Sequence, residues 1–224
     1  MKKALFLLIL ACLAFAHQPR IVEGSGLVEI ANPEISQAFY GELNGSPALF
    51  EIKSDVPFKL YVGITVPDVE GVKADKSVEV SEIGGSGKER RILILNGSGD
   101  WKPFYEEFGG DSYLRGPEGR LNVSAGTYRI RVYSPDDTGR YVLAVGEEEA
   151  FGPAETLNAL VLLPRLKSEF FGNPAFDAFF TKIYLFALVP LIALAALLAL
   201  LVWIARALAS SRASGTLKKK IALI

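Results

Sequence analysis

The amino-acid sequence predicts an all-β fold: an antiparallel, jelly-roll-like β-sandwich in residues 17–150, then a juxtamembrane helical connector in 151–182 and one transmembrane helix in 183–205. Two observations predict this order. Between residues 27 and 146, apolar and polar side chains alternate with a period of two, and no helical pattern interrupts them. Residues 183–205 form an apolar run without a charge, and a helix of that length, about 34 Å, crosses the ~30 Å hydrocarbon core of a bilayer.

The first 16 residues have the features of a secretory signal peptide. Two lysines precede an apolar stretch, and a site of the A-x-A type ends at Ala16. An uncleaved anchor helix is the alternative, but the apolar stretch is short for a membrane span. Lipidation of Cys12 is a second alternative, which the apolar residues around this cysteine do not favour. Cleavage after Ala16 would leave a mature chain that begins at His17 and contains no cysteine, so no disulfide would stabilise it.

Short strand candidates follow one another through the next part of the chain, and turn signals rich in Gly, Asn and Pro separate them. The candidates are Leu27–Ile30, Ile35–Leu43, Ala48–Lys53, Lys59–Val66, Val78–Ile83, Ile92–Leu95, Leu121–Ser124, Thr127–Tyr133 and Tyr141–Val145. Short strands that alternate in polarity are typical of an antiparallel sandwich, and a domain of this size can bury one core without disulfides.

Two of these strands carry a recognisable pattern. SAGTYRIRV at 124–132 and GRYVLAV at 139–145 are joined by a polar turn. Together they resemble the closing hairpin of the bacterial pre-peptidase C-terminal (PPC) domain family. The resemblance implies a jelly-roll-like sandwich with an accessory role and no catalytic residue. The secreted enzyme that usually adjoins such domains and their Asp-rich early segment are not evident here. The spacing itself predicts that Tyr128 and Tyr141 face the core.

Residues 100–113 are the most unusual stretch, with five aromatic and four acidic side chains and no clean period. We expect an irregular loop there. Its rings either present a binding surface to a protein or glycan, with Trp101, Tyr105 and Tyr113 as candidates, or plug an open end of the sandwich. Packing is the commoner use of apolar loop residues. A calcium site in its carboxylates lacks any supporting spacing, and we expect neither a metal nor a cofactor.

Three asparagines head N-x-Ser sequons near expected turns or strand edges. Asn96 and Asn122 are candidate glycosylation sites, whereas Pro47 weakens the sequon at Asn44. Whether they carry glycans depends on whether the source glycosylates such sites.

The connector contains a helix candidate at 154–163, which starts after Pro153 and ends or kinks at Pro164. It is apolar enough to lie on the bilayer surface or on the sandwich, so a free stalk is not expected. Aromatic residues flank the apolar run of 183–205, and every charge in 206–224 is positive. This bias predicts a single-pass protein of the cell membrane with residues 17–182 outside and a short basic tail in the cytoplasm.

Charge and motifs limit the function. Residues 17–182 contain 17 Lys and Arg against 25 Asp and Glu, a net charge of −8, which disfavours nucleic acid as a partner. No motif of a metalloprotease, serine hydrolase or phosphate loop occurs, and we expect no enzyme; a surface hydrolase is a remote alternative.

The sequence therefore predicts a membrane-anchored binding or accessory module for a protein or glycan, anchored in lipid by its single span. The alternatives are a structural subunit of a membrane complex and the cargo-receptor plan of the p24 family. The sequence departs from the p24 plan in two respects: the connector shows no coiled-coil heptads, and the tail has no terminal dilysine signal.

Overall fold

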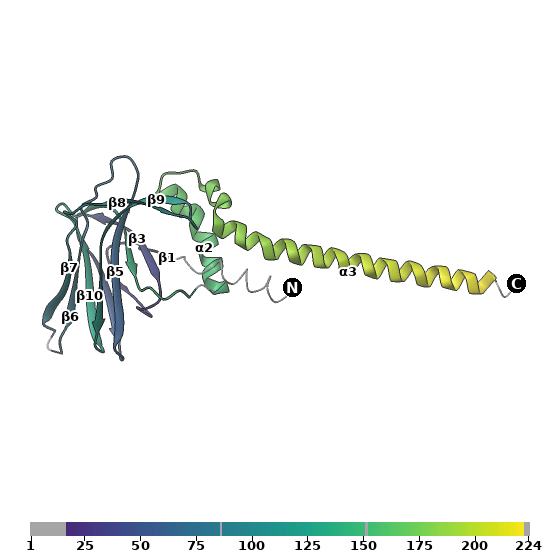
Figure 1. Cartoon of the computed structure of the whole chain (residues 1–224), viewed down its shortest axis with the longest axis horizontal. Coiled ribbons are helices and arrows are strands. Elements are labelled where there is room, and N and C mark those ends of the chain that lie inside the picture. Colours follow the sequence, from purple (N-terminus) through teal and green to yellow (C-terminus); the bar gives the residue numbers. More distant parts are fainter. Residues whose placement is uncertain (1–16, 86, 151, 222–224) are drawn as a thin grey trace. The chain divides into compact units, whose positions relative to one another are not determined.

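The computed structural model describes residues 17–85, 87–150 and 152–221, so the expected signal peptide with Cys12 and Ala16 lies outside the described residues (Figure 1). Eleven strands of the described part form two sheets. The six-stranded sheet has the order β1 (Gln18–Ile21), β3 (Gln37–Asn44), β11 (Thr138–Val145), β5 (Phe58–Pro67), β9 (Asp111–Val123) and β8 (Lys102–Glu106). The five-stranded sheet has the order β2 (Leu27–Glu29), β4 (Ala48–Ser54), β10 (Gly126–Tyr133), β6 (Ser77–Ile83) and β7 (Glu89–Leu95).

The core lies between the two sheets, as the period of two predicts. On β5, Leu60, Val62 and Ile64 point inward and are almost completely buried. Tyr128 and Tyr141 also face this core, which confirms their predicted position. The predicted sandwich is therefore present.

The strand pairing departs from the expectation in two ways. Residues 126–133 and 138–145 are adjacent strands in the sequence, but they do not form a hairpin: β10 pairs with β4 and β6, whereas β11 pairs with β3 and β5. The turn between them carries the chain from one sheet to the other. In addition, the sheets are not wholly antiparallel, because the N-terminal strands β1 and β2 pair in parallel with β3 and β4.

The stretch expected as an irregular loop, residues 100–113, is largely a hairpin. Strands β8 and β9 pair from Lys102 opposite Arg115 to Glu106 opposite Asp111. The tight turn between them is held by Glu106, whose carboxylate accepts the backbone N–H groups of Phe108 and Gly109 at 2.8 and 2.6 Å. The absence of a clean period in the sequence reflects this turn, which interrupts the alternation between the two strands.

The connector folds onto the sandwich. Helix α2 (Pro153–Arg165) begins with proline in its first turn, as predicted, and continues through the π-helical turn η1 (Leu166–Phe170). A 3₁₀ helix, η2 (Ala175–Phe180), precedes helix α3 (Lys182–Ile221). Phe170 and Phe171 pack with Tyr113 and Val142 on the outer face of the six-stranded sheet. The connector is thus part of the domain.

The described residues up to Ile183 form one compact unit, and those from Tyr184 onward form a second. The second unit is most of α3. Within α3, Lys182–Arg206 is long and apolar enough to cross a membrane, which agrees with the predicted span.

Candidate functional site

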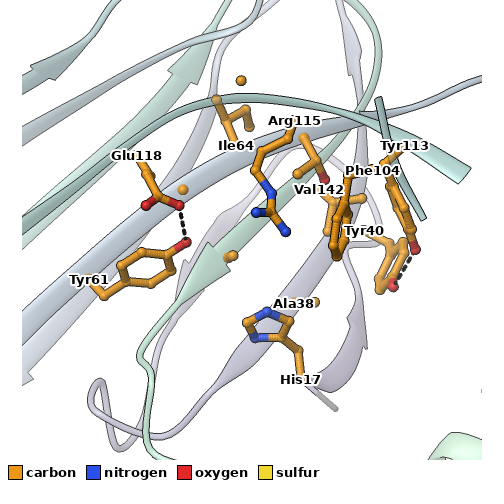
Figure 2. A pocket seen from close by; sticks show the side chains of 14 residues that line it. His17, Ala38, Tyr40, Tyr61, Ile64, Phe104, Tyr113, Arg115, Glu118 and Val142 are labelled. Carbon is orange, nitrogen blue, oxygen red and sulfur yellow. Dashed lines mark hydrogen bonds between the residues drawn. The ribbon is translucent and has the colours of Figure 1, made fainter. Parts of the chain in front are cut away.

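A groove lies on the outer face of the six-stranded sheet, where the connector leaves this face uncovered (Figure 2). Its floor is made by small residues on three adjacent central strands. Ala144 on β11 is in register with Ala38 on β3 and with Gly63 on β5, so three residues with little or no side chain lie in one row. A row of small side chains lowers the sheet surface locally, and we call the resulting hollow the sheet groove.

Larger side chains form the walls of the sheet groove around a cavity of about 90 Å³. Tyr61 on β5 and Glu118 on β9 stand on one side, and Phe104 on β8 stands on the other. Figure 2 shows the Arg115 guanidinium between these two walls, with the His17 ring opposite. A cavity of this volume is large enough to admit several non-hydrogen atoms of a ligand.

Hydrogen bonds fix the polar wall. The Tyr61 hydroxyl donates to Glu118 Oε2 at 3.0 Å, and Arg120 donates to Glu118 Oε1 at the same distance. The hydrogen bond from Arg120 lowers the pKa of Glu118, so this carboxylate remains ionised at neutral pH. Burial and the neighbouring Glu118 charge raise the pKa of Tyr61 to about 12, so its hydroxyl remains protonated. The wall therefore offers an ionised acceptor beside a tyrosine ring, and Arg120 covers one face of this ring at 4.8 Å from its centroid.

Arg115 differs from most arginines of the domain because its guanidinium stacks on an aromatic ring and donates no hydrogen bond to another residue that the structure describes. Its guanidinium lies 3.8 Å from the centroid of the Phe104 ring. No residue in the described part of the chain accepts a hydrogen bond from Arg115 or forms an ion pair with it. Directly opposite, Lys102 is its ladder partner on β8 and also lacks an acid partner among these residues. Like charges at opposed positions of a sheet repel one another, so the two cations favour an anion between or above them.

The other end of the sheet groove is closed by the connector. Tyr40 and Tyr113 share a hydrogen bond of 3.0 Å between their hydroxyls, and burial raises the pKa of both. Phe170 packs edge-on against Tyr40, and Phe171 packs edge-on against Tyr113, with ring centroids 5.1 and 5.3 Å apart. These aromatic contacts determine how much of the sheet face stays open.

The structure separates the three residues proposed from the sequence. Trp101 is partly buried, packs against the core and covers Gly116, and its indole N–H donates to the Gly97 carbonyl at 2.9 Å. Tyr105 is 59% exposed, whereas Tyr113 is only 5% exposed. The ring of Tyr113 lies beneath the connector and packs there, so its face is not presented to solvent. Tyr105 remains the exposed aromatic of this stretch.

The sequence reasoning did not identify Tyr61, Phe104, Arg115 or Glu118 as site residues. A signal was present in the strands themselves, because Gly63 and Ala144 occupy outward positions where a longer polar side chain is typical. Reading that signal requires the register between β5 and β11, which distant parts of the chain decide.

The remaining candidates are at the surface or without support. Asn96 and Asn122 are both exposed, and their glycosylation stays a prediction. In the searched part of the chain, no group of three or more His, Cys, Asp or Glu side chains could hold a metal ion. Of the carboxylates considered for calcium, Glu106 caps the β8–β9 turn and Asp111 pairs with Lys167.

No protein-family model matches the sequence, and no curated protein sequence matches it. Among solved structures, the chain is similar to the pre-peptidase C-terminal domain of a collagenase from Bacillus anthracis, with a TM-score of 0.35, 12% identity, and coverage of 56% of this chain and 97% of that one. It is also similar to a β-glucosidase from Paenibacillus barengoltzii, with a TM-score of 0.25, 9% identity, and coverage of 58% of this chain and 13% of that one. The first belongs to the family that residues 124–145 resemble. Similarity at this level says nothing about activity, and the fold assignment rests on the two sheets themselves.

Proposed function

We propose that the protein is a non-catalytic, membrane-anchored binding module whose domain lies outside the cytoplasm and whose ligand occupies the sheet groove. The observation that carries this proposal is the small-residue floor of Ala38, Gly63 and Ala144 beneath walls that offer a ring, an ionised acceptor and an unpaired guanidinium. Small concave sites with a few fixed polar groups are typical of ligand recognition.

The chemistry of the walls supports binding over catalysis. Glu118 is held in its ionised form by Arg120 and Tyr61, so it serves as an acceptor and is poorly suited to donate a proton. The Tyr61 hydroxyl already donates to Glu118 and has a raised pKa, which makes it a weak nucleophile.

Membrane anchoring is supported by the chain on either side of Lys182. The 25 residues that begin with it, Lys182–Arg206, can cross a bilayer by length and composition. Just before them, Phe176 and Phe180 of η2 are exposed, and aromatic residues at such positions favour the membrane interface. The basic residues after the apolar run favour a cytoplasmic C-terminus.

Retention of ligands by the full chain in lipid nanodiscs tests the binding role. Wild type and a Tyr61→Ala, Phe104→Ala double variant are applied to a glycan array and to envelope extracts, and retained molecules are identified. We expect ligands that wild type retains and the double variant loses. Equal retention by both proteins, or no retention by wild type, would contradict the proposal. A Tyr105→Ala variant, altered at an exposed ring outside the sheet groove, is the control.

The structural-subunit alternative has one observation in its favour. Leu157 and Val161, one helical turn apart on α2, are both exposed, and their side chains share one face of the helix. Such a face is available to a partner subunit. Purification in a mild detergent that keeps complexes together would reveal a stoichiometric partner, and replacing both residues with serine should release it.

A further inference from the structure

We infer that the sheet groove recognises the carboxylate of a uronic-acid unit in an acidic glycan, with Arg115 as the residue that binds it. This inference rests on the proposed binding function and specifies its ligand. The first observation is that the Arg115 guanidinium donates no hydrogen bond to another described residue. Arg115 has its ring-stacking face on Phe104 at 3.8 Å, which leaves its N–H edge for a partner in the cavity. A planar guanidinium binds carboxylates in a bidentate manner.

The second step is the local charge. The domain is acidic overall, yet Arg115 and its ladder neighbour Lys102 form no direct ion pair among the described residues; the Glu118 carboxylate feels the charge of Arg115 but is hydrogen-bonded to Arg120 and Tyr61. Several other arginines of the domain are in direct ion pairs: Arg20 binds Glu155, and Arg129 binds Glu51 and Glu89. An anion bound at Arg115 would relieve the repulsion between the two cations.

The third step concerns the rest of the ligand. Arg120 covers one face of the Tyr61 ring, 4.8 Å from its centroid, so a sugar ring has the other face of Tyr61 to stack on, and Glu118 beside it accepts hydrogen bonds from hydroxyl groups. A uronic acid presents these three groups together: a carboxylate, hydroxyl donors and a flat apolar face. The cavity of about 90 Å³ has room for the carboxylate and the atoms next to it, while the sugar ring lies over Tyr61.

The strand order favours a glycan over a peptide. The floor lies on β3, β11 and β5, and each of these strands has a neighbour on both sides in the sheet. Most of their backbone N–H and C=O groups are used in the sheet ladders, with a register shift on β5 between Gly63 and Thr65, so the floor lacks the continuous free edge on which a peptide backbone adds to a sheet. Recognition at this place depends on side chains.

Calorimetric titration of the full chain in lipid nanodiscs tests the inference, with trigalacturonate as the acidic probe and its fully methyl-esterified form as the neutral one. We expect wild type to bind the acid and not the ester. Arg115→Gln should weaken binding of the acid about ten- to hundredfold, the range expected for a charge-assisted pair. Lys102→Gln should weaken it several-fold, because that cation lies beside the site without contacting the carboxylate.

Arg131→Gln is the matched control. Arg131 is also an exposed arginine stacked on an aromatic ring, 5.0 Å from the centroid of Tyr133, but it lies on β10 in the other sheet. This variant should bind the acid as wild type does. Thermal unfolding of every variant verifies that the fold is unchanged.

Four results would overturn the inference: no binding of the acid, equal binding of the ester, an unaffected Arg115→Gln variant, or an equal loss in Arg131→Gln. A fifth is Arg115-dependent binding of N-acetyl-trialanine, a peptide with a free carboxylate, in the absence of binding to trigalacturonate. That result would assign the sheet groove to a peptide. It would leave the general binding function intact, so the two proposals fail separately.

Discussion

The ammonium group of Lys167 lies 2.6 Å from the carboxylate of Asp111, and both side chains are nearly completely buried, with 4% and 5% exposed. Lys167 also donates to the Gly110 carbonyl at 3.1 Å. Lys167 belongs to η1 in the connector, and Asp111 begins β9 in the sandwich. This buried ion pair thus joins the connector to the β8–β9 hairpin.

Breaking this pair should be costly, because it leaves a buried charge alone. We predict that Lys167→Met lowers the free energy of unfolding by about 3–5 kcal/mol. The Lys167→Met, Asp111→Asn double variant should lose less than the sum of the two single changes, and a double-mutant cycle from denaturant unfolding measures the difference. Lys73→Met breaks an exposed pair with Asp136 and should leave the midpoint almost unchanged. Additive losses would show that the two residues do not depend on each other.

The connector should also be needed for full stability of the domain. A fragment of residues 17–150 lacks the aromatic cover of Tyr113 and Val142 and leaves Asp111 without Lys167. We predict that a fragment of residues 17–181 melts at a higher temperature than 17–150, and that both show β-type circular dichroism. Equal melting temperatures would mean that the connector packs on the sandwich without stabilising it.

Trp101 should contribute mainly to packing. Its ring packs against the core and covers Gly116, and its N–H is hydrogen-bonded to Gly97. We predict that Trp101→Ala costs about 3 kcal/mol, the lower end of the range for large aromatic truncations, because the ring is only partly buried. Tyr105→Ala, at the exposed ring nearby, should cost no more than about 0.5 kcal/mol. A Trp101→Ala protein as stable as wild type would return this residue to the list of binding candidates.

Glu106 should give the domain a measurable pH dependence. Burial raises the pKa of Glu106 above the ordinary value of 4.5. The hydrogen bonds that its carboxylate accepts from two backbone N–H groups lower this pKa, but by less than burial raises it. The folded state then holds this proton more tightly than the unfolded chain, so stability falls as pH rises from about 4.5 to the raised pKa. Glu106→Gln should flatten this fall in denaturant titrations at a series of pH values. An unchanged slope would locate the pH dependence elsewhere, for example at Asp111, whose pKa burial also raises.

The residues before the span should lie at the membrane surface. Phe180 is 76% exposed and is two residues from Lys182, where the apolar helix begins. We predict that a spin label at Phe180→Cys in nanodiscs is reached by oxygen more readily than by a polar nickel reagent. A label at Val56→Cys, an exposed position in the turn before β5, should show the reverse. Identical accessibilities at both sites would contradict interfacial placement.

Topology has a separate test in intact cells. An impermeant thiol reagent should label a cysteine placed at Val56 and leave one placed at Ser214 unlabelled, because the basic residues after the span favour the cytoplasm. Labelling of Ser214→Cys alone would reverse the predicted orientation.

The sequence predicts the local elements of this fold better than their partners. Alternation along β5 identifies its inward residues, and Pro153 marks the start of α2. The predicted hairpin of β10 with β11 was wrong, because a short polar turn can either close a hairpin or carry the chain to the other sheet. Their real partners, β4, β6, β3 and β5, lie far away in the sequence.

The candidate site was harder to predict for the same reason. Its floor forms only when Ala38, Gly63 and Ala144 come into register, and no local pattern links these three positions. Tyr113 is an aromatic in a polar stretch, which is a typical binding signal, yet it is buried because η1 covers it. Whether an exposed strand face stays open depends on a segment more than fifty residues further along the chain.

The first strand of the domain has a consequence for the order in which the chain folds. Arg20 on β1 makes two hydrogen bonds to Glu155 on α2, at 2.8 and 3.0 Å, and Asn158 reaches the carbonyl of Pro19 at 3.3 Å. During synthesis β1 emerges early, but its covering helix emerges only after every other strand. The edge of the six-stranded sheet therefore stays without its covering helix until all eleven strands have been made. The domain is thus completed by a segment that directly precedes the apolar helix in the chain.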